Sequence, residues 1–400
     1  MSLGNWTSHK LKDLCYKITD GSHNPPKGVP SSPYLMLSSK NVNNDLLTFD
    51  KPRYLDEKNY IAENKRTQVQ EGDVLLTIVG TIGRAAVISK GVENLTFQRS
   101  VAVLKPRKQL VSSRFLMYLL QFNFELLNKN ARGVAQKGIY LRQLNDLSVY
   151  IPDIPTQDHI VSVLDDAFVD LEKVSFKLVE NSKNAEELFF SHLNQAFTAP
   201  LDDNWVRTPL SAHVRFIDYR GRTPKKTESG LKLITAKNVK MGYLQNAPEE
   251  FVDENIYSSW MVRGIPLMGD ILFSTEAPMG NVATLHTNEK VVFAQRIIIL
   301  QPDRSIINPE FLKFMLMSSY FQNLLSANGT GATVKGIKSS ILKRLPIVFP
   351  KSLGEQKNLA EKFTRLSSQC DVLKDSYNHK KTIVEELKKS ILNKAFSGEL

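Results

Sequence analysis

The sequence predicts an α+β protein made of two tandem copies of one unit, in which two globular domains are joined by two long helices that form an antiparallel coiled coil. Three observations predict it: motifs that recur at a nearly constant spacing, short β-rich runs bounded by turn residues, and a heptad pattern of apolar residues in each copy. The predicted segments are 1–149 and 200–347 for the globular domains, and 150–199 and 348–400 for the helices.

The repeat runs through the whole chain. Leu-Asn-Gln-Ala-Phe at 193–197 recurs as Leu-Asn-Lys-Ala-Phe at 392–396, which is 199 residues later. Gly-Asp-Val-Leu at 72–75 recurs as Gly-Asp-Ile-Leu at 269–272, and Lys-Gly-Ile at 137–139 recurs at 335–337. Solenoid repeats have periods of only about 20–50 residues. The pattern therefore indicates a duplicated domain with its connector, and it favours a partner that also presents two similar sites.

Each globular domain is predicted to hold a small sheet followed by a helix. The helices are expected at 113–128, opened by Ser112-Ser113, and at 309–325, with Asn308 as N-cap and Pro309 in the first turn. A glycine-bearing loop then leads in each copy to a last strand that ends at a proline, Pro152 or Pro350. The predicted strands are 34–37, 74–79, 85–88 and 101–104 in the first copy, and 233–235, 271–274, 282–285 and 297–300 in the second.

The two long helices are predicted from a narrow apolar stripe of the coiled-coil type. Asn181 and Lys380 interrupt it at the same place, and Cys370 stands where Leu171 stands, as a small core residue. A helix of about 40 residues spans ~60 Å, which matches ~17 base pairs of B-DNA. The stripe is Ile160, Leu164, Ala167, Leu171, Val174, Leu178, Asn181, Ala185 and Leu188, and it recurs 199 residues later as Leu359, Phe363, Leu366, Cys370, Leu373, Tyr377, Lys380, Val384 and Leu387.

The bulk properties favour an anionic partner, nucleic acid first and a membrane surface second. The formal net charge is +11 and the pI is about 9.3. The two cysteines, Cys15 and Cys370, do not occupy matched positions, so we expect free thiols in a reducing compartment. The start has no signal-peptide pattern, and no run of 18 apolar residues predicts a membrane span. A cytoplasmic protein is expected.

Two segments resemble catalytic motifs without completing them. His23-Asn24-Pro25-Pro26 resembles the Asn-Pro-Pro-aromatic motif of DNA amino-methyltransferases, but Lys27 replaces the aromatic residue and no glycine-rich cofactor turn accompanies it. The loop at 329–336 fails the spacing of a phosphate-binding loop. The histidines and cysteines show no metal-ligand spacing, so neither a cofactor nor a metal is expected.

Our candidates for DNA contact are basic and amide residues at matched places in the two globular domains, together with the basic, Gly/Pro-punctuated loop at 217–226. Such side chains can bind base edges in the major groove, although lysines more often contact phosphates. Arg84 stands where the second copy has Asn281, so this position is a better candidate for reading different bases. Shared residues could equally preserve the fold, and the Gln-Arg pairs could be structural. The candidates are Lys40, Asn41, Arg84, Gln98, Arg99 and Lys137, and, in the second copy, Arg222, Lys225, Lys226, Lys237, Asn238, Gln295, Arg296 and Lys335.

The ordered set of motifs resembles the specificity subunit of type I restriction–modification systems, over essentially the whole chain. The resemblance rests on the tandem plan, the two Lys-Gly-Ile loops, the Pro-to-Gln helix starts at 152–157 and 350–356, and the matched helix ends at 193–197 and 392–400. Thr156-Gln157 departs from the Glu-Gln pair that is usual in the family and is kept as Glu355-Gln356. This departure could alter a partner contact on the first helix.

The resemblance implies two target recognition domains, each reading one half of a split sequence in double-stranded DNA. The helices would act as a spacer ruler and as a docking surface for two methyltransferase subunits that carry S-adenosylmethionine. Restriction subunits, which translocate DNA with ATP, would join them. The chain itself would specify the target without catalysing a reaction.

Two other functions stay open on the residues alone. A catalytic DNA methyltransferase would bind S-adenosylmethionine as an isolated chain. A coiled-coil scaffold without a DNA role would show no steep loss of DNA affinity with salt, which phosphate contacts produce.

Overall fold

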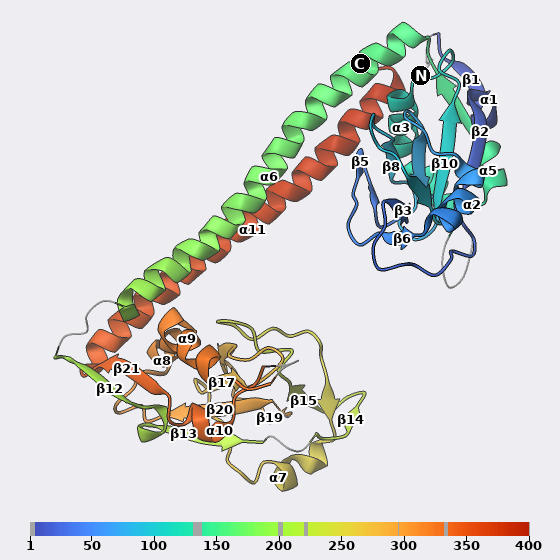
Figure 1. Cartoon of the computed structure of the whole chain (residues 1–400). Coiled ribbons are helices and arrows are strands. Elements are labelled where there is room, and N and C mark those ends of the chain that lie inside the picture. Colours follow the sequence, from blue (N-terminus) through green and yellow to red (C-terminus); the bar gives the residue numbers. More distant parts are fainter. Residues whose placement is uncertain are drawn as a thin grey trace. The chain divides into compact units, whose positions relative to one another are not determined.

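The computed structural model describes residues 5–130, 138–198, 203–219, 223–294, 296–331 and 335–399 (Figure 1). The chain divides into two compact units. Unit 1 comprises residues 1–178 and 379–400, and unit 2 comprises residues 179–378. Each unit therefore contains one globular domain together with part of each long helix.

Unit 1 is a mixed α+β domain. Its short helices are α1 (Leu11–Leu14), α2 (Glu57–Thr67), α3 (Ser113–Phe122), α4 (Phe124–Asn130) and α5 (Leu141–Asn145). Its strands are β1 (Thr7–Lys10), β2 (Cys15–Asp20), β3 (Tyr34–Leu37), β4 (Val42–Asn43), β5 (Leu46–Leu47), β6 (Arg53–Leu55), β7 (Val74–Thr77), β8 (Ala85–Val87), β9 (Leu95–Phe97), β10 (Val101–Pro106) and β11 (Ser148–Ile151).

Unit 2 repeats this plan. Its short helices are η1 (Leu210–Ala212), η2 (Glu254–Ile256), α7 (Tyr257–Trp260), α8 (Pro309–Met317), α9 (Ser319–Asn328) and α10 (Ser339–Leu342). Its strands are β12 (Trp205–Pro209), β13 (Val214–Asp218), β14 (Lys226–Thr227), β15 (Leu231–Ile234), β16 (Phe251–Val252), β17 (Ile271–Ser274), β18 (Val282–Thr284), β19 (Val291–Phe293), β20 (Ile297–Pro302) and β21 (Pro346–Pro350).

Matching sheets form in the two units. The main sheet is antiparallel, with strand order β2-β10-β7-β8 in unit 1 and β13-β20-β17-β18 in unit 2. A second sheet has the order β6-β3-β9 in unit 1 and β14-β16-β15-β19 in unit 2. The first and last strands of each globular domain also pair, β1 with β11 and β12 with β21. The predicted boundaries at 149 and 347 fall inside these last strands.

The main sheet of unit 1 is buried on both faces, which explains the continuous apolar runs of its strands. Val74 and Leu76 pack with Phe115 of α3 in one core cluster. Leu75 and Val103 point to the other face, where they pack with Phe97 of the second sheet. The alternation follows from the period of two along a strand.

The predicted helices after the sheet are each broken into two, so the prediction of single helices is wrong. Asn123 separates α3 from α4, and its Nδ2 donates to the main-chain oxygen of Leu119 at 2.8 Å. Ser318 separates α8 from α9 with an extended backbone, and its hydroxyl donates to Met315 O at 2.6 Å. Such local side-chain bonds compete with the helical bonds of the backbone.

The long helices are α6 (Ile154–Thr198) and α11 (Leu353–Ser397). In unit 1 the first part of α6, at Leu164, shares a core with the last part of α11, at Leu392. In unit 2 the last part of α6 meets the first part of α11, and the rings of Phe197 and Phe363 lie 6.2 Å apart. The two helices are therefore antiparallel, as predicted. Cys370 is buried in the core of unit 2 and both cysteines are free, as expected.

The predicted heptad stripe is wrong at four apolar positions. Val174 and Leu188 in α6, and Leu373 and Leu387 in α11, are 42–47% exposed. After Ala185 the buried positions of α6 shift to a spacing of four residues, so that Phe189 replaces Leu188. A straight helix drifts ~20° per heptad, which moves a strict seven-residue stripe out of the contact. The drift occurs at the same positions in both copies.

Gln157 and Gln356 explain the repeated Pro-to-Gln motif at the start of the long helices. Both side chains are fully buried. The Oε1 of Gln157 accepts from Ser112 N–H at 3.0 Å, and its Nε2 donates to the carbonyl oxygens of Leu110 and Pro152, both at 2.9 Å. Gln356 makes the same three bonds in unit 2, at 2.8–2.9 Å. Each glutamine ties a long helix to the loop before α3 or α8.

We expect Gln157→Leu to lower the free energy of unfolding by about 3 kcal/mol or more, because three main-chain groups lose their partners. Urea denaturation of the full chain measures the change. Asp158→Ala, on the exposed neighbouring residue, is the control and should shift stability by less than about 0.5 kcal/mol. Equal midpoints for Gln157→Leu and the wild type would refute this role for the buried amide.

Candidate nucleic-acid interface

Loops of unit 1 gather at one edge of the main sheet. Strands β2 and β7 end at this edge, and β8 and β10 begin there, because the sheet is antiparallel. The parallel strands β3 and β9 of the second sheet also end beside it. We call these loops the rim of unit 1, defined as residues 20–24, 38–41, 78–84, 98–100 and 138–140.

Main-chain hydrogen bonds join the rim loops to one another. Arg99 N–H donates to Ser22 O at 2.8 Å, and Ile78 N–H donates to Ser100 O at 2.9 Å. Ile139 N–H donates to Ile78 O at 2.8 Å, which brings Gly138 and Ile139 to the rim. A glycine is required at position 21, since a Cβ there would overlap the carbonyl oxygen of Phe97.

Unit 2 builds a matching rim, defined as residues 218–219, 235–238, 275–281, 296 and 335–337. Thr275 N–H donates to Arg296 O at 2.8 Å, and Ile337 N–H donates to Thr275 O at 3.0 Å. These bonds correspond to those of Ile78 and Ile139 in unit 1. The duplicated sequence therefore places equivalent loops at equivalent sheet edges.

Asn41 and Asn238 serve the structure of the rims. Asn238 is buried; its Oδ1 accepts from Thr235 N–H at 2.9 Å and its Nδ2 donates to Pro248 O at 3.0 Å. Asn41 is also buried and bonds Ser38 N–H and Asp50 O in the same way. Their amides are engaged by the main chain, which leaves base contact to other rim residues. The lysines before them, Lys40 and Lys237, are exposed.

Arg84 and the matched Asn281 have different hydrogen-bond partners. Arg84 is half-buried, and its Nη1 donates to Asn43 Oδ1 at 3.0 Å. The Nδ2 of Asn281 donates to Val239 O at 2.9 Å. Unit 1 thus presents a guanidinium at a rim position where unit 2 presents a main-chain-bonded amide.

The Gln-Arg pairs lie in the rims. Gln98 is half-buried and forms a bridge with Ser22, whereas Arg99 is exposed. Arg296 is also exposed, has a φ of 77°, and its Nε lies 2.7 Å from Glu276 Oε1. Gln295 lies outside the described residues. The arginines, rather than Gln98, are therefore the accessible members of these pairs.

Of the five remaining predicted DNA contacts, three lie within the described residues. Lys335 is exposed beside the bridge between Gly336 and Glu276. Lys225 is exposed, and Lys226 lies in β14 at the edge of the second sheet, with its Nζ 2.8 Å from Glu250 Oε1. Lys137 and Arg222 lie outside the described residues.

Three residues at or beside the rim are absent from the predicted contacts: Asp20 and His23 in the rim, and Arg66 in helix α2. The Asp20 side chain is buried between His23 Nε2, at 2.7 Å from its Oδ2, and the guanidinium of Arg66. Arg66 Nε also donates to the carbonyl oxygen of Asp20 at 3.0 Å. The basic pair Lys65-Arg66 ends helix α2, and this signal could have identified a cationic side chain near the loop at 20–24.

Among the described residues, no group of three or more histidine, cysteine, aspartate or glutamate side chains could hold a metal ion. Within the same part of the chain, no helix has the length and apolar character needed to cross a membrane.

The fold defines a class: a duplicated α+β protein with two antiparallel long helices and two equivalent loop rims. The family model of the type I restriction modification DNA specificity domain matches residues 4–181 and 264–380. This match covers more than half of the chain, so the chain belongs to that family. It is a specificity subunit with a DNA target recognition domain, as the sequence motifs predicted.

Curated relatives carry the same description. The putative type I restriction enzyme MjaX specificity subunit of Methanocaldococcus jannaschii is 24% identical over 436 residues, which cover 99% of this chain and 94% of the relative. The type I restriction enzyme EcoKI specificity subunit of Escherichia coli (strain K12) is 26% identical over 208 residues, which cover 50% of this chain and 44% of the relative.

Solved structures share the fold. A chain from a type I R-M system, solved in a study of its complex assembly and conformational transition, is 17% identical with a TM-score of 0.73 over 99% of both chains. The HsdS subunit from Thermoanaerobacter tengcongensis is 18% identical with a TM-score of 0.52, over 99% of this chain and 98% of that one.

Proposed function

We propose that the chain reads a bipartite sequence in double-stranded DNA, with one rim for each half, and directs partner subunits to it. One observation carries the proposal: equivalent loops gather at equivalent sheet edges in both units, yet the side chains at matched rim positions differ, as the half-buried Arg84 and Asn281 do. Shared backbone bonds preserve the rim, while different side chains give different readings of the base edges. The net charge of +11 supports an anionic partner.

The proposed DNA contacts are the cations of the rims, the glutamines of the two Gln-Arg pairs, and basic residues that lie outside the rims or outside the described ranges. Exposed lysines and arginines suit phosphate contacts, which position the protein and make binding sensitive to salt. Half-buried Arg84 is held by Asn43 and suits a base contact. The proposed set is Lys40, Arg84, Gln98, Arg99 and Lys137 for the first half-site, and Arg222, Lys225, Lys226, Lys237, Gln295, Arg296 and Lys335 for the second.

We further propose that the long helices dock two methyltransferase subunits. Unit 1 exposes Val174 and Leu387, and unit 2 exposes Leu188 and Leu373, at matched positions of the repeat. Two like apolar surfaces suit two like partners, since exposed apolar positions at an interface are covered on binding. The methyltransferase subunits would supply S-adenosylmethionine and the chemistry, restriction subunits would add translocation, and this chain would catalyse neither step in the cytoplasm.

Salt-dependent binding tests the DNA proposal. We expect the logarithm of the affinity for duplex DNA to fall linearly with the logarithm of salt concentration, and Lys40→Ala or Arg99→Ala to reduce the slope by about 1 each. Fluorescence anisotropy with the full chain measures the slope. Lys173→Ala is the control, because Lys173 lies on α6 and pairs with Asp170 at 3.0 Å. Binding that ignores salt would contradict the proposal and favour the scaffold reading.

A further inference from the structure

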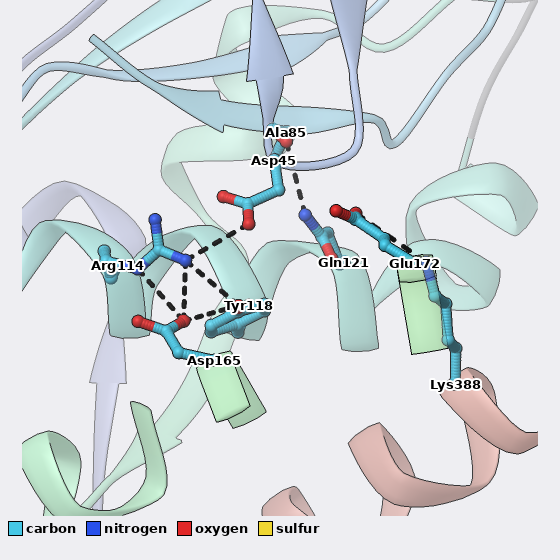
Figure 2. Close-up of polar contacts among 8 residues, drawn as sticks. All are labelled: Asp45, Ala85, Arg114, Tyr118, Gln121, Asp165, Glu172 and Lys388. Carbon is cyan, nitrogen blue, oxygen red and sulfur yellow. Dashed lines mark hydrogen bonds and ion pairs between the residues drawn. The ribbon is translucent and has the colours of Figure 1, made fainter. Parts of the chain in front are cut away.

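A charged network in unit 1 joins three elements that are distant in sequence (Figure 2). Arg114 projects from α3; its Nη2 lies 2.6 Å from Asp165 Oδ1 on α6 and 3.1 Å from Asp45 Oδ2 in the turn between β4 and β5. Its Nε also donates to Asp165 Oδ1 at 3.1 Å. The guanidinium therefore fastens the β4–β5 hairpin to the long helix.

Tyr118 fixes the carboxylate that receives Arg114. It is fully buried, and its hydroxyl donates to Asp165 Oδ1 at 2.7 Å. Burial raises the pKa of the Tyr118 hydroxyl and the hydrogen bond to Asp165 raises it further, so the group remains a neutral donor. The ring of Phe168, one turn along α6, packs edge-on at 5.5 Å. Asp165 is thus held in one orientation from two sides.

Asp45 has two energetically unfavourable features, one in its backbone and one in its side chain. Its φ is 68°, in the left-handed region that favours glycine, and the second copy has Gly242 there with a φ of 94°. The two positions are equivalent, because Asp45 N–H bonds Ala85 O at 2.9 Å and Gly242 N–H bonds Val282 O at 2.7 Å. In addition, Asp45 Oδ1 is buried and has no hydrogen-bond partner among the described residues. An aspartate at this position indicates a role beyond the turn itself.

The same hairpin holds the arginine that we propose as a base reader. Asn43 lies in β4, and its Oδ1 accepts from Arg84 Nη1 at 3.0 Å. Asp45 lies two residues further along and bonds Arg114. A displacement of the hairpin would therefore move the partner of Arg84, since both contacts depend on the same short turn.

Unit 2 lacks every charged member of this network. The positions of Asp45, Arg114 and Asp165 hold Gly242, Glu310 and Thr364. Glu310 instead accepts from Thr284 Oγ1 at 2.7 Å and pairs with Lys313. At these matched positions, the charged network is therefore present in unit 1 and absent from unit 2.

We propose that Asp45, Arg114 and Asp165 are positioning residues that hold Arg84 for reading the first half-site, by clamping the β4–β5 hairpin to helix α6. The proposal rests on the proposed function, because it assigns a role within DNA reading. It predicts that loss of the clamp relaxes discrimination at the first half-site and leaves the second half-site unaffected.

The test uses Asp45→Gly, which installs the residue of the second copy and suits the positive φ, so the fold should be retained. Binding of the full chain is measured on duplexes that carry the mapped target and on duplexes with one base pair changed in either half. We expect Asp45→Gly to reduce discrimination in the first half-site by roughly tenfold, the scale of one lost base contact. Discrimination in the second half-site should stay the same.

A double-mutant cycle separates positioning from general stability. Arg84→Ala alone should cause a similar loss, and Asp45→Gly combined with Arg84→Ala should lose little more than either, because both act through one contact. Glu172→Gln is the control: Glu172 lies on α6, and its Oε1 pairs with Lys388 of α11 at 3.8 Å rather than with the hairpin (Figure 2). This control should bind like the wild type.

Three possible results distinguish failure of the proposed function from failure of the clamp. A wild-type chain that binds DNA without sequence preference would overturn the proposed function and the clamp together. A wild-type chain that discriminates, with Asp45→Gly discriminating equally well, would overturn the clamp alone. Fully additive losses in the cycle would also overturn it, since Arg84 would then not depend on Asp45.

Discussion

Exchanging the first globular domain for that of a relative is expected to change one half of the recognised DNA sequence and to leave the other half unaltered. Each unit has its own sheets, cores and rim, so the two halves should be read independently. The joint belongs after Ile151, because β11 pairs with β1 and a joint at 149 would cut this strand. The expected effect is large, since each mismatched base pair reduces binding by about 1–3 kcal/mol.

Sequencing of bound DNA, selected from a random duplex pool by the full exchanged chain, measures this outcome. The reciprocal exchange of residues 203–350 is the matched control and should alter the opposite half. If either exchange moved both half-sites, independent reading by two rims would be wrong.

Adding one heptad to both long helices is expected to lengthen the unread gap between the half-sites by about three base pairs. Seven residues add ~10 Å to a helix, and base pairs of B-DNA are spaced ~3.4 Å apart. The insertions belong after Leu178 in α6 and after Asn378 in α11, where the two units divide. Matched insertions preserve the antiparallel pairing that Glu172–Lys388 and Phe197–Phe363 mark.

The same selection experiment reads the gap length directly. A heptad added to α6 alone is the control: it breaks the register between the helices and should lower stability without producing a defined new gap. An unchanged gap with both insertions would show that the helices do not set the spacing.

The sequence predicted the duplicated plan well, because local signals determine it. Strands β3 and β17 begin and end where the runs at 34–37 and 271–274 predicted, and Asn308 caps α8 through its side chain as expected. Apolar periodicity and capping are short-range patterns that one chain displays. The heptad stripe failed at Val174 and Leu188 because helical drift accumulates with length and is not visible in a local window.

The rim could be predicted only in part, because residue type does not reveal burial in a loop. Asn41 and Lys40 are neighbours in sequence, yet one is buried by main-chain bonds and the other is exposed. The clamp was beyond sequence reasoning, since Arg114 finds its partners 51 and 69 residues away. Such pairings depend on tertiary packing, which a single sequence does not display.

Mapping of methylated positions in the host genome, with and without this chain, tests the central claim most directly. The claim predicts that removal of the chain abolishes methylation at one bipartite motif, made of two short specified halves and a gap of fixed length. Methylation that persists at that motif, or a lost motif that is continuous and undivided, would contradict the reading of DNA by two rims.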